Sequence, residues 1–189
     1  MSLRILAGLA LFAASLIAEQ HRLAAGPDTV VVGNYWAQNK PVLKINSGDT
    51  VVVETVGTAG VAVLERLGVP AAQIPDSLRE ITKAIADKKL DRGPGGHILT
   101  GPIFIDGAEP GDVLEVHIDR IELPVPWAHN GFSPTSGFLK DEFTERYNRL
   151  IPLDREHMLG RFAPGISVPL RPFFGSMGVA PPPAAPSCL

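Results

Sequence analysis

The sequence predicts a mainly β protein with antiparallel sheets in a sandwich or jelly-roll-like arrangement and one or two short helices. β-Branched residues gather in short runs at residues 29–32, 42–45 and 50–55. Gly, Asn and Asp residues separate these runs, a pattern typical of antiparallel hairpins. The runs of consecutive valines further indicate strands that are covered on both faces, as in a sandwich.

Composition and charge narrow the class of protein. The 189 residues are 45% hydrophobic and 20% charged, which is the composition of a globular chain with one good-sized core. The net charge of −3 and the absence of a Lys/Arg cluster interleaved with aromatic residues argue against a nucleic-acid partner. The single cysteine, Cys188, excludes an internal disulfide, and we expect an exposed thiol in the tail rather than a catalytic one.

The N-terminus has the pattern of a secretory signal peptide. A basic start at Arg4 precedes an apolar run over residues 5–18 that is too short for a comfortable membrane span. Cleavage after Ala18 or near Ala24-Ala25 would place the protein outside the cell or in the periplasm. An uncleaved anchor and an incidental apolar N-terminus are the alternatives. We assign residues 1–25 to the signal peptide and linker, and expect residues 19–27 to be unstructured linker.

One helix is predicted to begin near Asp76. Ser77 and Glu80 have capping-box spacing, and apolar residues follow along one helical face. Lys88-Lys89, followed by Gly93-Pro94, mark its end. The apolar positions are Leu78, Ile81, Ala84 and Ile85.

A strand is predicted over residues 114–123. Leu114, Val116 and Ile118 alternate with charged or polar residues, and then the alternation slips by one position. Such a slip predicts a β-bulge near Asp119-Arg120. His117 falls on the polar face, so we expect it to face solvent.

The residues that follow this strand are predicted to be less regular. Residues 127–132 are interpreted as a loop in which Trp127, His129 and Asn130 either line a pocket or form a packed tryptophan beside polar groups. For residues 140–157 we expect a short helix through Asp141-Glu142-Phe143 and a turn near Asp154.

Residues 93–116 organise the chain. Gly and Pro divide this stretch into a loop, a strand, a tight turn and a second strand, and place His97 in a constrained loop. The stretch resembles the acetamidase/formamidase family, and further matches occur in the family's order. The matching segments are HILTGP at residues 97–102, GAEPGD at 107–112, SGDTV with Glu54-Thr55 at 47–55, and PFFGSMGVAPP at 172–182.

The resemblance implies a β domain over residues 29–182 that hydrolyses small linear amides to carboxylate and ammonia, and it implies that residues 172–182 pack back on the core. It also implies that the chain corresponds to the N-terminal half of a family member. Residues 183–189 are a Pro/Ala-rich tail without a strand or helix signal.

Four residues are candidates for the site. His97 is predicted to act as an acid/base group or a metal ligand, unless it only hydrogen-bonds its turn. Glu54 either marks a site or tops a strand, because burying a carboxylate in a valine run is costly. Thr100 and Asn130 are candidate substrate-binding residues. Asp49, Asp112 and Glu109 are expected to stabilise turns instead.

The sequence alone does not identify a cofactor. A divalent metal ion such as zinc is the candidate, because histidine and carboxylates are common metal ligands. The alternative to a working amidase is a truncated, catalytically incomplete member that acts as a folded fragment or binding module. A carbohydrate-type binding module would explain Trp36 and Trp127 but not the ordered motifs. Unpaired strand edges also predict self-association or pairing with a complementary second half.

Overall fold

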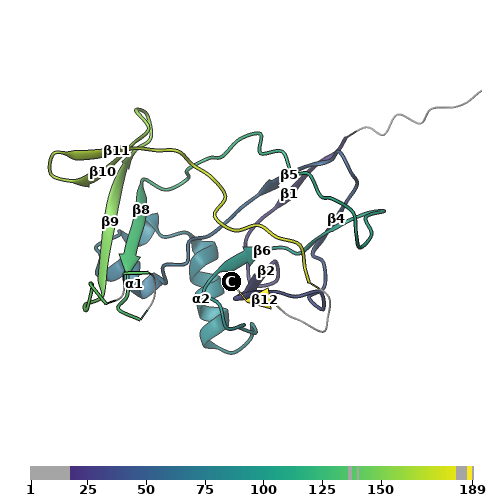
Figure 1. Ribbon diagram of the computed structural model, residues 1–189, viewed down its shortest axis with the longest axis horizontal. Coiled ribbons are helices and arrows are strands. Elements are labelled where there is room, and N and C mark those ends of the chain that lie inside the picture. Colours follow the sequence, from purple (N-terminus) through teal and green to yellow (C-terminus); the bar gives the residue numbers. More distant parts are fainter. Residues whose placement is uncertain (1–17, 136–137, 140, 182–186, 189) are drawn as a thin grey trace, which may run out of the picture.

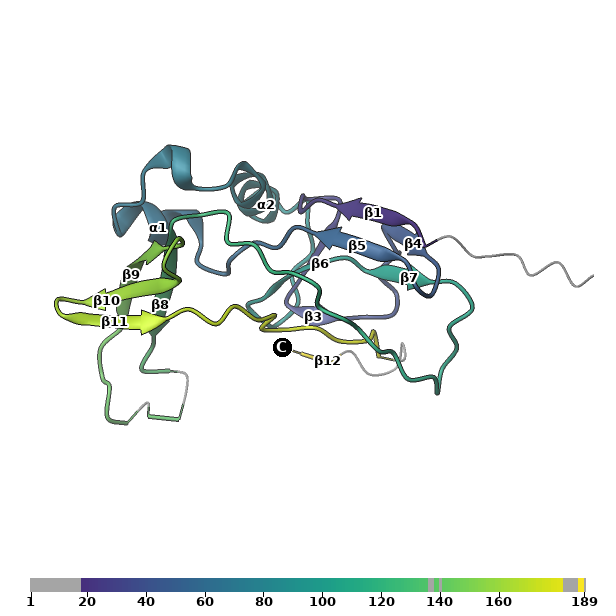
Figure 2. The same cartoon turned by 90° about the horizontal axis from the view of Figure 1, so that it is seen from above.

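The computed structural model describes residues 18–135, 138–139, 141–181 and 187–188, and has the predicted fold class. Strands make up 29% of the described residues and helices 12%, with antiparallel sheets and two α-helices. A four-stranded sheet lies at one end and short strand pairs lie at the other, with both helices on one side (Figures 1 and 2). Most of the predicted signal peptide, residues 1–17, is outside the described residues. Within them, no helix is long and apolar enough to cross a membrane.

The strands are short and mostly paired over long sequence separations. The four-stranded sheet has the order β11-β10-β9-β8, and the two-stranded sheets are β1-β5, β2-β6, β4-β7 and β12-β3. The strands are β1 (Gln20–Leu23), β2 (Val30–Val32), β3 (Asn34–Tyr35), β4 (Leu43–Ile45), β5 (Thr50–Val53), β6 (Ile98–Thr100), β7 (Ile103–Ile105), β8 (Trp127–Phe132), β9 (Tyr147–Asp154), β10 (Leu159–Ala163), β11 (Ile166–Pro169) and β12 (Ser187–Cys188).

The β-branched runs do form strands, but the prediction that they pair as neighbouring hairpins is wrong. β4 pairs in parallel with β7, and β5 pairs in parallel with β1. β2 pairs antiparallel with β6. The expected linker at residues 19–27 is also wrong, because β1 lies within it and Leu23 and Ala25 belong to the core. The apolar side chains of this segment are buried, which a solvated linker would not allow.

Asp49 ties β1 to the turn between β4 and β5. Its carboxylate accepts hydrogen bonds from the backbone N–H of Glu19 (2.9 Å) and of Asn46 (2.8 Å) and lies 3.1 Å from Nε2 of His21. The side chain is only 4% exposed. The two backbone donors, and then His21, hold the pKa of Asp49 well below its usual range. Asp49 therefore has the turn-stabilising role expected of it.

Helix α2 (Asp76–Ala86) has the predicted apolar face but a different start. Pro75 is the N-cap and no side chain caps the helix, so the predicted capping box is wrong. Ser77 lies inside the first turn and donates to Oε1 of Glu54 (2.9 Å) instead. At the other end, the N–H of Lys89 bonds the carbonyl of Ala84 and the N–H of Lys88 that of Ile85, which is a Schellman motif.

A second helix, α1 (Val61–Arg66), and a 3₁₀ turn (Ala71–Gln73) precede α2 and were not predicted. Six residues are too few for a clear helical period, so the sequence pattern does not show α1. Buried side chains form two clusters, and Val56 and Ile98 pack against both. The first cluster contains Leu64, Val69, Ile74 and Leu78, and the second contains Ala25, Val30 and Ile81.

The four-stranded sheet replaces the irregular segment expected after residue 126. Residues 127–132 form β8 rather than a loop, and β8 pairs antiparallel with β9 from Trp127 opposite Pro152 to Phe132 opposite Tyr147. No helix forms at residues 141–143, and β9 occupies residues 147–154. Cross-strand pairing overrides the weak local pattern here. The predicted turn near Asp154 is correct, because the carboxylate accepts from the N–H of His157 (3.1 Å).

Two long connectors do not form the structure that the sequence predicts for them. Residues 113–123 are coil rather than a strand, and no bulge forms. The segment at residues 172–181 does not bury its aromatic residues as expected, since Phe173 is 80% exposed. A strand needs a neighbour to satisfy its backbone groups, and the described residues provide none for 113–123. Conversely, the tail expected to lack strands contributes the two-residue β12, which pairs with β3.

The loop that begins at Gly93 is fastened to the junction of β2 and β3. The N–H of Gly33 donates to the carbonyl of His97 (2.8 Å), and the N–H of Gly95 donates to the carbonyl of Gly33 (2.9 Å). Gly33 has φ of 87°, and an added Cβ would lie 2.7 Å from the carbonyl oxygen of Gly93. Only glycine fits this close approach of two backbones.

We expect Gly33→Ala to lower the free energy of unfolding by about 2–5 kcal/mol, because it adds a steric clash to left-handed backbone strain. Gly48→Ala is the matched control, with φ of 92° and no atom within 4 Å of the added Cβ. It should cost only about 1–2 kcal/mol. Urea unfolding of both variants measures the difference, and equal losses would contradict the packing described for Gly33.

Acid should destabilise the fold through Asp49. Because folding lowers the pKa of this carboxyl from its ordinary value of 3.8, its contribution to stability is present above pH 3.8 and is lost as the pH falls below that value. Asp49→Asn should flatten the acid side of a plot of unfolding free energy against pH. Asp112→Asn, in another turn that accepts a backbone N–H, is the control and should retain the steep acid side. Identical profiles for the two variants would rule out this role of Asp49.

Candidate functional site

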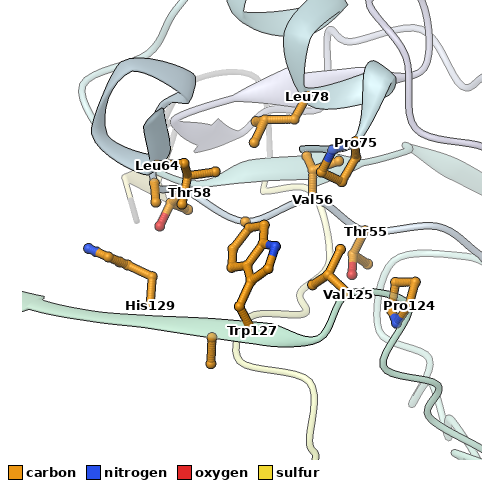
Figure 3. A pocket seen from close by; sticks show the side chains of 13 residues that line it. Thr55, Val56, Thr58, Leu64, Pro75, Leu78, Pro124, Val125, Trp127 and His129 are labelled. Atoms are coloured by element: carbon orange, nitrogen blue, oxygen red, sulfur yellow. The ribbon is translucent and has the colours of Figure 1, made fainter. Parts of the chain in front are cut away.

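A cleft of about 320 Å³ lies between β8, the two helices and the segment that follows β5. Figure 3 shows Trp127 and His129 rising from the same side of β8 toward Val56, Thr58 and Leu78. Most of the lining is apolar, and the polar side chains are those of Thr55, Thr58, Trp127 and His129. The complete lining is Thr55, Val56, Gly57, Thr58, Ala59, Leu64, Pro75, Leu78, Pro124, Val125, Trp127, Ala128 and His129.

Trp127 both lines the cleft and packs on the core, so the two interpretations of this residue hold together. Its ring packs against the cluster that contains Leu64 and Leu78. Its indole N–H donates to the carbonyl of Gln73 (3.3 Å), which joins β8 to the 3₁₀ turn before α2. The tryptophan therefore fixes the distance between the sheet and the helices, and so the width of the cleft.

His129 is the titratable side chain of the cleft. Its Nε2 lies 2.9 Å from Oδ1 of Asn148 on the adjacent strand β9. An amide oxygen can only accept, so Nε2 carries the proton in this arrangement and Nδ1 is left as the acceptor nitrogen. A neutral imidazole in that tautomer can take a proton from water or a ligand.

The sequence predicts that Trp127, His129 and Asn130 could line a pocket, but it selects only Asn130 as a substrate-binding residue and not His129. Side chains alternate along a strand, so Trp127 and His129 share one face of β8 while Asn130 lies on the other. Asn130 is exposed, is opposite Arg149 of β9, and is not among the lining residues of the cleft. Recognising residues 127–132 as a strand would have selected His129.

The structure brings Glu54 and Thr100 together. Glu54 follows β5 directly and is exposed, so it tops the strand rather than lying buried in it. Its Oε1 accepts from Ser77 Oγ (2.9 Å) and its Oε2 from the N–H of Ala25 (3.3 Å). The Thr100 hydroxyl donates to the backbone carbonyl of Glu54 (2.7 Å). Glu54 thus links β1, β6 and the start of α2, next to Thr55 in the wall of the cleft.

His97 lies apart from that pair. It is exposed in the loop before β6, and its backbone carbonyl accepts the N–H of Gly33 (2.8 Å). Along the extended chain into β6, His97 and Leu99 face one way, and Ile98 and Thr100 face the other. Ile98 packs on both core clusters, so the His97 side chain points away from the core.

The described residues do not fit a metal site. No group of three or more His, Cys, Asp or Glu side chains converges among them, whereas catalytic zinc usually has three protein ligands. His97 would need ligands from outside the described residues to hold an ion.

A family model described as the acetamidase/formamidase family matches residues 25–187. An acetamidase of Mycolicibacterium smegmatis is 34% identical over an alignment of 100 residues, and the alignment covers 46% of this chain and 24% of the relative. A Schizosaccharomyces pombe protein named as a formamidase is 33% identical over an alignment of 91 residues, and the alignment covers 45% of this chain and 22% of the relative.

Two crystal structures share the fold. A protein of Thermoanaerobacter tengcongensis, titled a predicted acetamidase/formamidase, matches with a TM-score of 0.56 and 22% identity over 81% of this chain and 43% of its own. The acetamidase of Bacillus halodurans matches with a TM-score of 0.57 and 20% identity over 88% of this chain and 48% of its own. The chain therefore spans less than half the length of each relative it matches.

The two roles of Trp127 can be separated by mutation. Trp127→Phe removes the hydrogen bond to Gln73 and should lower the free energy of unfolding by about 1 kcal/mol. Trp127→Ala also removes the ring from the core and should cost about 2–4 kcal/mol. Denaturant unfolding with circular dichroism measures both, and Trp127→Ala costing no more than Trp127→Phe would show that the ring does not support the core.

Proposed function

Since this chain belongs to the acetamidase/formamidase family, we propose that it hydrolyses small linear amides, such as formamide or acetamide, to a carboxylate and ammonia. The observation that carries the proposal is the family match over residues 25–187. It covers every segment that forms the cleft and both members of the Glu54–Thr100 pair.

The cleft supports a small, uncharged substrate. Its walls are mainly apolar, with a few hydroxyl and imidazole groups, which is the usual composition of a site that orients a neutral ligand by a small number of hydrogen bonds. A primary amide offers a carbonyl acceptor and an N–H donor to such groups. No lysine or arginine is among the lining residues, so the cleft offers no charge partner for an anionic substrate.

Amide hydrolysis requires a group that activates water and a group that protonates the leaving amine. In our proposal, the His129 imidazole accepts a proton through Nδ1 at the cleft, and Thr55 and Thr58 orient the amide. Glu54 and His97 remain proposed acid/base groups, and Thr100 and Asn130 remain proposed substrate-binding residues, although none of the four is among the residues that line the cleft. The Thr100 hydroxyl donates to the backbone carbonyl of Glu54, while Ser77 and the N–H of Ala25 hold its carboxylate.

Export is part of the proposal, and β1 restricts where the signal peptide could be cut. Cleavage after Ala18 leaves β1 (Gln20–Leu23) and its pairing with β5 intact. Cleavage near Ala24-Ala25 would remove β1 and the buried Leu23. We therefore propose cleavage after Ala18 in an exported protein.

The second candidate function is that of a folded fragment that binds but does not catalyse. The observation that favours it is that neither Glu54 nor His97, the two residues predicted from the sequence to be catalytic, is among the residues that line the cleft. A binding-only chain would retain the cleft and its affinity for a small amide without releasing ammonia.

Ammonia release from formamide and acetamide by the purified chain tests the proposal. We expect Glu54→Gln to reduce kcat by about 10²–10⁴-fold, because the amide keeps an acceptor for Ser77 but cannot take a proton. His97→Ala and His129→Ala should reduce it by similar factors. Glu109→Gln, in an exposed turn, is the control and should leave the rate unchanged.

The same preparations should be checked for folding by circular dichroism. A folded chain that releases no ammonia, with or without added divalent metal, would overturn the proposed activity and favour the binding fragment. A folded Glu54→Gln variant with full activity would remove Glu54 from the catalytic groups.

A further inference from the structure

The connector at residues 113–123 has the features of a β-strand without a partner. Glu115 Oε1 lies 3.0 Å from Nε2 of His117, and Arg120 Nη2 lies 2.6 Å from Oε1 of Glu122. Both pairs join residues two positions apart, which share a side only when the backbone is extended. Leu114, Val116 and Ile118 alternate with Glu115 and His117 and are each about half exposed.

This connector is held at both ends. Before it, the N–H of Glu109 donates to the carboxylate of Asp112 (2.8 Å). After it, Nη1 of Arg155 donates to the carbonyls of Leu123 (2.9 Å) and Pro124 (3.1 Å). Between these anchors, no hydrogen bond joins the backbone of residues 113–122 to any other described residue. An extended segment with a free backbone edge and fixed ends is preorganised to accept a strand.

Its sequence is complementary to itself in an antiparallel register centred on Val116. Leu114 then lies opposite Ile118 of a second copy, and Val116 lies opposite Val116, so the apolar side chains meet on one face. On the other face, Glu115 lies opposite His117 twice. Asp112 lies opposite Arg120 at each end of the apolar face, and Val113 lies opposite Asp119 on the polar face. The complementary pairs are therefore Glu115 with His117 and Asp112 with Arg120.

The described residues of the chain do not cover the connector or block this pairing. Among the described residues, ten hydrophobic side chains are buried while twenty large ones are exposed, so much apolar surface remains uncovered. The connector runs along the outside between the four-stranded sheet and the short strand pairs (Figure 2). We propose that residues 112–120 are a docking strand that pairs antiparallel with the same residues of a second copy of this chain.

A pair of nine-residue strands buries less than a standard interface, so we expect a reversible dimer with a dissociation constant on the order of 10 µM. Sedimentation equilibrium of the full chain over a wide concentration range should show it. Hydrogen exchange should show protection of amides within residues 113–119 that increases with protein concentration. A chain that stays monomeric at all concentrations would overturn the proposal. Protection of these amides only after another polypeptide is added would also overturn it, because the partner would then not be a second copy.

Adjacent lysine substitutions test which face forms the apolar contact. Val116→Lys places two cations opposite each other at the centre of the pair and should weaken dimerisation at least about tenfold. His117→Lys places a cation opposite Glu115 and should leave the dimer intact. Both positions are exposed, so circular dichroism should show unchanged folding. Dimerisation that survives Val116→Lys would contradict the register.

A charge exchange provides the most specific test. Glu115→Lys alone places lysine opposite His117, and His117→Glu alone places glutamate opposite Glu115, in each of the two symmetric pairs. Each single substitution should therefore weaken the dimer about tenfold. The double variant should restore the affinity of the parent. Restoration is expected only if the two residues face each other across two copies, and its failure with folded proteins would overturn the proposal.

Discussion

The apolar face of helix α2 is the packing interaction on which this fold depends. Leu78 belongs to one core cluster and Ile81 to the other, so the helix joins two sets of side chains that strand pairing alone would leave separate. Most of the sheets have only two strands, and such pairs are marginally stable in water without a packed face. The helix supplies that face for β2 and β6 through Val30 and Ile98.

The candidate site depends on the same packing. The cleft is the space left where Trp127 of β8 meets the start of α2 and the segment after β5. Glu54 lies at that junction because its carboxylate accepts from Ser77 in the first turn of α2. The proposed chemistry therefore uses residues that also hold elements together, and substitutions such as Glu54→Gln are needed to separate proton transfer from structure. His129 is better placed for that separation, because its polar contact is with a neighbouring strand.

The exposed connectors give the protein a second property besides the cleft. A core that buries ten hydrophobic side chains leaves residues such as Val116 and Phe173 in solvent. Within the described residues, no segment packs over this surface closely enough to bury it. Association through the connector and catalysis at the cleft are separate proposals, because no residue of the connector at 112–120 lines the cleft.

Local sequence determined the class of the fold, the positions of β2, β4, β5, β6 and β7, and the buried face of α2, because side-chain shape and periodicity act within a few residues. The motif around His97 and Thr100 identified the family. Tertiary structure alone decided which strands pair, since β1 with β5 and β4 with β7 join distant segments. It also determined that residues 127–132 form a strand, so that His129 and not Asn130 lines the cleft. The strand predicted at residues 114–123 has no partner among the described residues. Strand formation requires a neighbour for the backbone, and the sequence of a strand does not say which neighbour it will have.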